Sequence, residues 1–434
     1  MRQLFSLSTV SGRARCCILG AECLKAVYTA LTTGIFLTGF LISAGLDDAQ
    51  LGFATSLPLI SGILYPLSPL LLERFQKRKL LLGGARLCYH SLVICSITVL
   101  PTFVHSSKMV LFVTLCLIAG NAINVVVASG FPAWHIGFLP EDIRAKFYAV
   151  SGVVNGIFTA IASLIASFLA DLSRQSQHQL FWLGAIRMAA FFIALVELVL
   201  LLLPKEIPYP PSPYSPRQLF VLPLQNKKFC LTMIPVFGWA MISTMTAYSA
   251  NAYLLERVQV PYLFVSLLQA CNVVVTAVTM PFWYKLLMRR SWFGAFQMVF
   301  LWFSVYPLLH AMVTQNNYRI LLPITLLVYQ ALMAGGTLYF SNMAYIFTPN
   351  ESRTVYLSWY LMVVNMGSLG GQALSALLTK HLNNSTLLQR LCLAPAQIIL
   401  LLQAALALGF GIWFGKVLLK KLCDETAPTT KGDF

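Results

Sequence analysis

The sequence predicts an all-α membrane protein with twelve transmembrane helices. Its residues are 58% hydrophobic and only 10% charged, and its mean hydropathy is +0.76. A helix needs about 20 apolar residues to cross the roughly 30 Å hydrocarbon core, whereas open strands would leave backbone groups unpaired in lipid. Charged or turn-rich segments separate twelve long apolar runs, at residues 17–45, 51–72, 80–102, 109–133, 147–170, 181–203, 230–254, 261–283, 292–313, 320–346, 357–379 and 395–417.

The first run, residues 17–45, follows Arg13 and Arg15 and ends in the small residues Ser-Ala-Gly, as a secretory signal can. It is longer than the roughly 7 to 15 apolar residues of a signal peptide. We therefore expect it to be retained as the first helix.

A segment rich in proline and cationic residues, 204–229, separates the sixth run from the seventh. Because proline cannot continue a helix, we expect a cytosolic linker there. The predicted domains are thus an N-terminal six-helix bundle (1–203), the linker (204–229), a C-terminal six-helix bundle (230–418) and a cytosolic tail (419–434).

The distribution of Lys and Arg orients the predicted helices. With the N-terminus in the cytosol, inner segments hold 21 of the 30 Lys and Arg residues and outer loops hold six, while Lys25, Arg86 and Arg187 lie within helices. The positive-inside rule then places both termini in the cytosol of a multi-pass cell-membrane protein. The net charge of +16 reflects this cytosolic excess and its attraction to the lipid bilayer, so no nucleic-acid partner is needed.

The two halves share a sequence repeat. FLPEDIRAKFYAV at 138–150 matches FTPNESRTVYLSW at 347–359 at a constant offset of 209 residues, which aligns Arg144 with Arg353. Both copies lie between the fourth and fifth runs of their half. This agreement predicts duplication of a six-helix unit, and therefore two pseudo-symmetric bundles.

The segment ERFQKRK at 73–79 resembles the major facilitator superfamily signature Gly-x-x-x-Asp-Arg-x-Gly-Arg-Arg. Glu73 stands for the aspartate, Arg74 matches, and Lys77 and Arg78 stand for the basic pair, while Pro69 and Gln76 replace the glycines. The repeated Pro-containing segments after the fourth and tenth runs also resemble this family. The resemblance implies two bundles that rock about a central site, with helices 1, 4, 7 and 10 lining the cavity.

Charged residues at the predicted cytosolic ends of helices are candidates for a gate. Arg144 and Arg353 recur at equivalent places in the two halves. Our hypothesis is that they form interlocks that close one access state. The proposed gating residues are Glu73, Arg74, Arg78, Arg144 and Arg353.

Uncharged polar side chains on the fourth, seventh and tenth runs are candidates for a substrate cavity. Residues three apart share one face of a helix, and amides, hydroxyls and phenols suit a neutral or amphiphilic solute. The alternative for each is a hydrogen bond between helices. The candidates are Asn121, Asn124, Tyr248, Asn251, Tyr329, Gln330, Tyr339 and Asn342.

Charges within the predicted helices each need a partner or a route to water. Glu22 and Lys25 are spaced to pair on one helix face; they serve either proton or substrate coupling, or a plain ion pair at the cytosolic end. We expect Arg86 to reach the cytosolic surface and Arg187 to be structural or to reach outwards. Arg187 and Glu197, ten residues apart on one helix, do not pair with each other.

The sequence favours a secondary active transporter of a small-molecule solute, functional as a monomer, over a membrane sensor or scaffold and over a polytopic membrane enzyme. The histidines are scattered and no nucleophile and base are suitably spaced, so we expect no enzyme activity. No clustered Cys/His spacing indicates a metal site or another cofactor. The sequence leaves open whether transport is coupled to protons.

Overall fold

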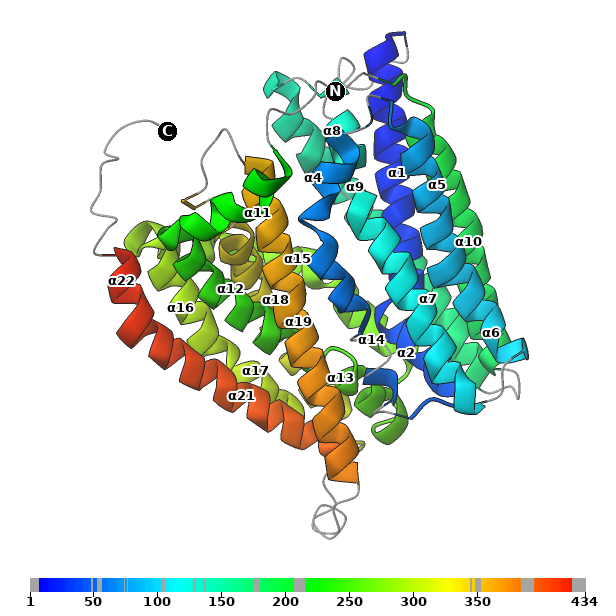
Figure 1. Cartoon of the computed structure of the whole chain (residues 1–434). Helices are drawn as coiled ribbons and strands as arrows, with labels where there is room; N and C mark the ends of the chain where they lie inside the picture. The colour runs from blue at the N-terminus through cyan, green and yellow to red at the C-terminus, as the bar shows by residue number, and fades with distance from the viewer. Residues whose placement is uncertain are drawn as a thin grey trace. The chain divides into compact units, whose positions relative to one another are not determined.

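The computed structural model describes residues 8–47, 50–52, 57–73, 75, 77–103, 106–127, 130–135, 138–139, 141–174, 179–206, 215–343, 346–347, 353–383 and 394–423. These residues form helices joined by short turns (Figure 1). The chain folds as two compact units: unit 1 is Met1–Ser215 with Pro261–Leu267, and unit 2 is Pro216–Val260 with Leu268–Phe434. The predicted all-α membrane fold is therefore confirmed.

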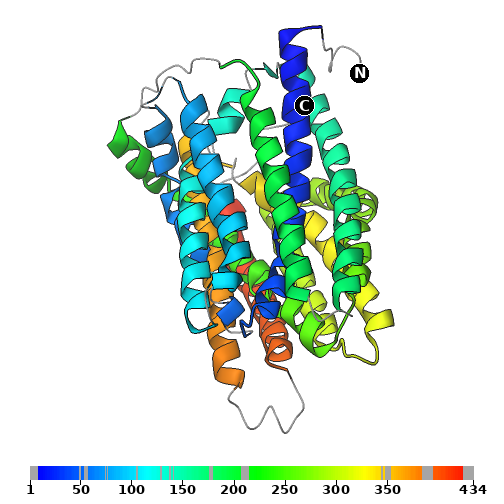
Figure 2. The same ribbon diagram turned by 90° about the vertical axis from the view of Figure 1, so that its right-hand side faces the viewer.

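In unit 1, α1 packs lengthwise against both α9 and α10, as Figure 2 shows, and α5 packs on α7 and α10. The elements are α1 (Val10–Thr32), α2 (Gly34–Ser43), η1 (Leu57–Leu64), α4 (Leu67–Glu73), α5 (Lys79–His90), η2 (Ser91–Ser96), α6 (Ile97–Phe103), α7 (Ser106–Val127), α8 (Gly130–His135), α9 (Glu141–Arg174) and α10 (Gln179–Leu202).

In unit 2, α12 packs along α19, and α21 packs against α16 and α17. The elements are α11 (Pro216–Gln225), α12 (Lys227–Thr244), α13 (Ser249–Ala252), η4 (Tyr253–Arg257), α15 (Asn272–Arg289), α16 (Trp292–Phe303), α17 (Val305–Ala311), α18 (Tyr318–Met343), α19 (Arg353–Asn383), α21 (Pro395–Trp413), η6 (Phe414–Leu418) and α22 (Leu419–Cys423); α14 (Tyr262–Ala270) begins in unit 1 and ends in unit 2.

Eleven helical segments of the described residues are long and apolar enough to cross a membrane, and they correspond to eleven of the twelve predicted runs. In the second run, 51–72, residues from 57 onwards form the 3-10 helix η1 and the short α4, while residues 53–56 lie outside the described residues. Prolines at 58, 66 and 69 remove backbone donors within that run, which interrupts a continuous α-helix.

The predicted linker contains a helix, which the sequence analysis did not anticipate. Helix α10 ends at Leu202 as expected, but α11 forms within the proline-rich segment. Pro216 occupies the first helical position, where no N–H is needed and the fixed φ angle suits a helix. Helix α11 packs on α12 and α19, and the Tyr356 hydroxyl donates to the Leu222 carbonyl at 3.3 Å.

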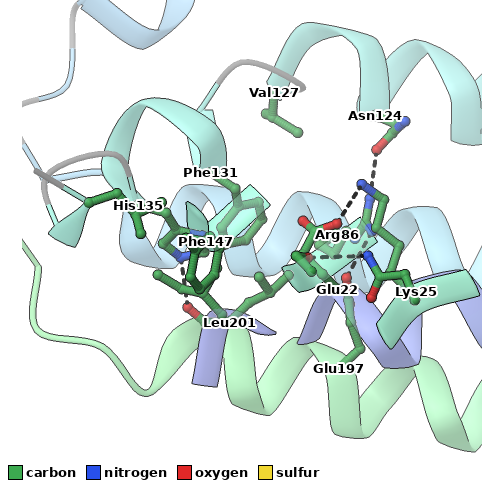
Figure 3. A pocket seen from close by; sticks show the side chains of 14 residues that line it. Glu22, Lys25, Arg86, Asn124, Val127, Phe131, His135, Phe147, Glu197 and Leu201 are labelled. Atoms are coloured by element: carbon green, nitrogen blue, oxygen red, sulfur yellow. Dashed lines mark hydrogen bonds and ion pairs between the residues drawn. The ribbon is translucent and has the colours of Figure 1, made fainter. Parts of the chain in front are cut away.

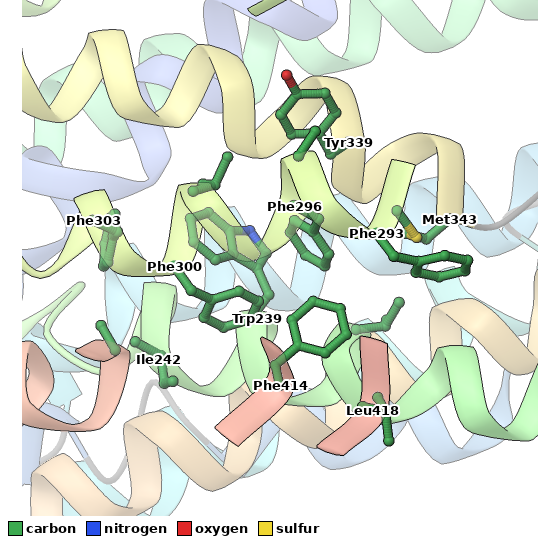
Figure 4. Close-up of a cluster of buried hydrophobic side chains, with 14 of the residues drawn as sticks. Trp239, Ile242, Phe293, Phe296, Phe300, Phe303, Tyr339, Met343, Phe414 and Leu418 are labelled. Carbon is green, nitrogen blue, oxygen red and sulfur yellow. The ribbon is translucent and has the colours of Figure 1, made fainter. Parts of the chain in front are cut away.

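The core of unit 2 is an aromatic cluster centred on Trp239 of α12 (Figure 4). The rings of Phe296, Phe300 and Phe303 lie 5.8, 5.3 and 5.1 Å from the Trp239 ring, each in an edge-to-face arrangement. Such pairs add about 0.5 to 1.5 kcal/mol beyond burial. Gly336 of α18 faces the Trp239 ring so closely that an added Cβ would overlap it.

We expect the substitution Gly336→Ala to destabilise the protein, because Trp239 is enclosed by other rings and cannot retreat. Overpacking of this kind costs about 1 to 3 kcal/mol. Gly409→Ala on α21 is the matched control, since an added Cβ there meets nothing within 4 Å. Thermal unfolding of the purified protein should show a lower midpoint for Gly336→Ala only; equal midpoints for the two variants would contradict this packing.

Candidate functional site

Unit 1 contains a cavity of about 460 Å³, walled by α1, α5, α7, α8, α9 and α10 (Figure 3). One part of its wall is polar or charged and the other is aliphatic and aromatic. The lining residues are Ile18, Glu22, Lys25, Arg86, Asn124, Val127, Phe131, His135, Leu139, Phe147, Ser151, Asn155, Glu197 and Leu201.

Arg86 of α5 is the centre of the polar wall. Its Nη2 donates to Glu197 Oε1 of α10 at 2.9 Å and to the Tyr28 hydroxyl of α1 at 2.5 Å. Its Nη1 donates to Asn124 Oδ1 of α7 at 3.1 Å. One guanidinium thus connects four helices, because its planar fork presents several donors in fixed directions.

His90, one helical turn after Arg86, lies on the other side of the carboxylate. Its Nε2 is 3.5 Å from Glu197 Oε2, and neither atom has a hydrogen-bond partner among the described residues. The Tyr28 ring meets the His90 ring edge to face at 5.0 Å. We call Tyr28, Arg86, His90, Asn124 and Glu197 the Arg86 network.

The network is shielded from solvent. His90 and Glu197 side chains are 0% and 1% exposed, and Arg86 is 12% exposed. A buried ion pair must recover the desolvation of both charges, and removing one partner leaves an uncompensated charge. Arg86 and Glu197 therefore depend on each other.

Glu22 and Lys25 form the ion pair that their spacing predicts, with Nζ and Oε2 3.8 Å apart. Their side chains are 41% and 49% exposed, so the pair contributes little to stability. Glu22, Lys25, Arg86 and Glu197 together give the cavity wall two negative and two positive charges. Its formal net charge is therefore zero.

His135 of α8 adds no charge to this wall near neutral pH. It is buried, with Nε2 3.4 Å from the Leu201 carbonyl. Burial lowers the pKa of His135 to about 4, against the opposing effects of that carbonyl and of Glu197. The imidazole is therefore neutral wherever the pH is well above 4.

The predicted cavity residues of the fourth helix differ in their contacts. Asn124 lines the cavity through its bond to Arg86, whereas the Asn121 amide donates to the Leu117 carbonyl of its own helix at 2.8 Å. Only Asn124 therefore joins Glu22 and Lys25 at the cavity.

The predicted residues of the seventh and tenth helices lie in unit 2. Tyr248 precedes α13. The Asn251 side chain donates to the Ala247 carbonyl in the turn before that helix, and the Asn342 side chain donates to the Leu338 carbonyl of its own helix. The other three are packing residues: the Tyr329 ring lies 4.6 Å from the Tyr306 ring, Gln330 donates to the Leu268 carbonyl, and fully buried Tyr339 donates to the Trp283 carbonyl.

The expectation for Arg86 is wrong, whereas the contacts of Arg187 agree with the first of its two alternatives, a structural role. Arg86 does not extend to the cytosolic surface, because Glu197 and Asn124 hold it inside. Arg187 does not reach outwards: it is 1% exposed and donates to the Thr32 and Val93 carbonyls and to the Thr98 hydroxyl. As expected, it makes no pair with Glu197.

The partnership of Arg86 and Glu197 had a signal in the sequence. Arg86 follows the start of α5 by seven residues, and Glu197 precedes the end of α10 by five. At about 1.5 Å per residue the two charges have similar depths below the same predicted membrane surface. Comparison of depth between helices, rather than spacing within one helix, would have paired them.

Of the predicted gating residues, Arg78 is described in most detail. Its Nε donates to the Phe75 carbonyl at 2.8 Å, and its backbone N–H, like that of Lys79, donates to Glu206 Oε1. This carboxylate caps the start of α5. Arg74 and the side chains of Glu73, Arg144 and Arg353 lie outside the described residues.

The described residues contain no group of three or more His, Cys, Asp or Glu side chains arranged to hold a metal ion. The chemistry that the Arg86 network offers is thus hydrogen bonding, charge pairing and proton binding.

Comparison with known proteins gives the family. The sequence profile of the Major Facilitator Superfamily matches residues 23–372. A search of curated protein sequences finds no match.

Solved structures with a similar fold include the nucleoside transporter NupG, with a TM-score of 0.66, 14% identity and coverage of 95% of this chain and 99% of that chain. A D-xylose-proton symporter has a TM-score of 0.65 at 14% identity, with coverage of 94% and 98%. A bacterial homolog of the human lysosomal transporter Spinster has a TM-score of 0.63 at 14% identity, with coverage of 97% and 99%.

We expect Arg86→Met to destabilise the protein by about 3 to 5 kcal/mol, because Glu197 would remain as an unpaired buried charge. The double variant Arg86→Met with Glu197→Met should recover most of this loss, since both charges are then absent. Denaturant or thermal unfolding of the four proteins in a double-mutant cycle measures the coupling. Additive losses in the double variant would show that the two side chains do not depend on each other.

Proposed function

Because this chain belongs to the Major Facilitator Superfamily, we propose that it is a secondary active transporter that moves a small neutral or amphiphilic solute by alternating access. It is a multi-pass membrane protein of transporter type rather than an enzyme. We further propose that it works as a monomer in the cell membrane with both termini in the cytosol, as the excess of Lys and Arg in the predicted inner segments favours.

The observation that carries the proposal is the composition of the unit 1 cavity. Its charged residues cancel, and its remaining wall combines amides with apolar and aromatic side chains such as Phe131 and Phe147. A net charge of zero disfavours a strongly ionic solute, while the mixed wall suits a molecule with a polar and an apolar side. Two structurally similar proteins are a nucleoside transporter and a D-xylose-proton symporter, and nucleosides and D-xylose are neutral polar molecules.

For proton coupling we propose Glu197 with His90, in preference to Glu22 and Lys25. Glu197 Oε2 and His90 Nε2 are buried proton acceptors 3.5 Å apart that lack other hydrogen-bond partners among the described residues. A proton bound to either atom can bridge the two. Buried carboxylates and histidines of this kind serve as proton relays in other transporters.

Protonation of Glu197 would also change the cavity. The carboxyl would lose its negative charge, and the ion pair with Arg86 would weaken. Arg86 would then keep Tyr28 and Asn124 as partners and turn part of its hydrogen-bonding capacity towards a solute. Proton binding and solute binding would thus be linked through one guanidinium.

Other titratable groups surround this site and set the conditions of a test. Glu22, Lys25 and Tyr28 face it from α1, Tyr89 adjoins His90 on α5, and His135 lies on α8. Glu22 is the matched control, because it is a glutamate of the same cavity that is exposed and lacks contact with His90 among the described residues.

Transport by purified protein in proteoliposomes tests the proposal. Radiolabelled nucleosides and pentoses are the first probes, and a thermal-shift screen of neutral solutes extends the set. We expect an imposed pH gradient to drive uptake by the wild type and by Glu22→Gln, and Glu197→Gln to retain only exchange that is independent of the gradient.

If uptake lost its dependence on the pH gradient in Glu22→Gln alone, proton coupling would belong to Glu22 and Lys25 instead of Glu197 and His90. Solute binding without flux under any gradient would favour a sensor or scaffold over a transporter.

The gate proposed for Arg144 and Arg353, with Glu73, Arg74 and Arg78, has its own test. Arg144→Ala should change the population of the two access states, because one interlock would be lost. The measurement is maleimide labelling of Asn155→Cys, placed in the cavity wall, after replacement of the ten native cysteines. Lys146→Ala is the control on the same helix; equal labelling rates in all proteins would exclude Arg144 from the gate.

A further inference from the structure

The first membrane helix of each unit is broken within the membrane. In unit 1, α1 ends at Thr32, Thr33 is extended with φ −123° and ψ −178°, and α2 begins at Gly34 with φ +56°. In unit 2, α12 ends at Thr244, and a turn over residues 245–248 leads into α13. Helix α2 and the segment α13 with η4 are therefore separate half-helices.

The two breaks occupy equivalent places in the sequence repeat. The offset of 209 residues carries Thr33 onto Ile242, which lies in α12 three residues before the turn that begins at Met245. The duplicated unit thus has the same discontinuity twice, within a few residues. A chance kink would not be expected to recur in this way.

Arg187 lies on α10, the sixth predicted membrane span, and its side chain reaches the break after α1. Its Nη1 donates to the Thr32 carbonyl at 3.0 Å, and its Nη2 and Nε donate to the Val93 carbonyl and the Thr98 hydroxyl, both at 3.1 Å. Its guanidinium also lies 5.1 Å from the Phe40 ring centroid on α2. Arg187 therefore contacts both halves of the broken helix.

Gln403 lies on α21, the twelfth predicted membrane span, and its side chain reaches the break after α12. Its side chain is fully buried. Its Nε2 donates to the Ile242 carbonyl at 2.6 Å, and its Oε1 accepts from the Thr246 hydroxyl at 3.0 Å. Gln403 therefore joins the end of α12 to the turn that follows.

A broken helix in lipid leaves carbonyls without their usual amide partners, and no water is there to replace them. A donor from a neighbouring helix can stabilise one broken geometry over the others. Arg187 and Gln403 supply such donors from the corresponding helix of each unit, although they differ in residue type and are not aligned by the repeat. The two residues share the hydrogen bond that each donates to a backbone carbonyl near the break, not the residue type.

We propose that Arg187 and Gln403 are positioning residues for transport. Arg187 fixes the break after α1 and Gln403 fixes the break after α12, and each thereby sets the direction of the half-helix that follows. In unit 2 that half-helix carries Asn251, and Tyr248 lies in the turn directly before it; the sequence predicts both as candidate solute contacts. The proposal is independent of the identity of the solute and of proton coupling.

Amide hydrogen exchange of the purified full-length protein tests each clamp locally. Loss of a hydrogen bond to a charged or buried group should speed exchange of the neighbouring amides about tenfold or more. We expect Arg187→Met to accelerate exchange at residues 33–38 and near its other partners, Val93 and Thr98, while unit 2 stays unchanged. Gln403→Leu should accelerate exchange at residues 243–250 while unit 1 stays unchanged. Each variant serves as the control for the other unit.

Gln297→Leu is the matched control in unit 2. The Gln297 side chain also donates to a backbone carbonyl, that of Gly411 at 3.3 Å, but away from the break. It should leave exchange at residues 243–250 unchanged. Thr246→Val should give a smaller acceleration than Gln403→Leu, because the bond from Gln403 to Ile242 remains.

Unchanged exchange at the breaks, or equal acceleration along a whole unit, would overturn the proposal. If Arg187→Met does not fold, Arg187→Lys takes its place, since it keeps the charge but provides one nitrogen instead of three. It should accelerate exchange at residues 33–38, and wild-type rates there would count against a clamp.

Discussion

A polar group inside a bilayer has no water to bond, so it must find its partner within the protein. In unit 1 this constraint acts on Glu197, a carboxylate with 1% exposure. Arg86 balances its charge, and the two Nη groups of the guanidinium also donate to Tyr28 and Asn124. The same constraint explains why helices form the spans and why a donor lies at each broken helix. The polar wall of the cavity thus includes groups, such as Glu197 and Arg86, that needed partners within the protein.

The two units meet this constraint with different chemistry. The offset of 209 residues carries Arg86, Asn124 and Glu197 onto Ala295, Met333 and Leu406, and in unit 2 these positions are apolar. Ala295 belongs to the core around Trp239, where close aromatic packing replaces the ion pair. Duplication therefore preserved the scaffold of helices, while the charged network is present in one half.

The sequence predicted the membrane fold well, because a helix that crosses lipid must be long and apolar wherever it packs. Hydropathy did not reveal the 3-10 segment η1 within the second run or the short helix α11 within the predicted linker, both in proline-containing segments. The sequence predicted Asn124 for a substrate cavity and Glu22 with Lys25 as a coupling pair or a plain ion pair, and all three line the unit 1 cavity, but it placed Arg86 at the surface. Partners on different helices depend on packing, which spacing along one helix does not encode. Tyr339 shows the converse, since a polar side chain on a predicted cavity helix lies in the core.

Proton coupling as we propose it requires Glu197 to bind and release a proton while it is buried beside Arg86 and His90. Infrared difference spectroscopy of the purified protein during a pH titration tests this most directly, because it detects the carboxyl group itself. The account predicts a protonated-carboxyl band that appears on acidification in the wild type and in Glu22→Gln, shifts when a solute binds, and is missing in Glu197→Gln. An identical band in Glu197→Gln would contradict it.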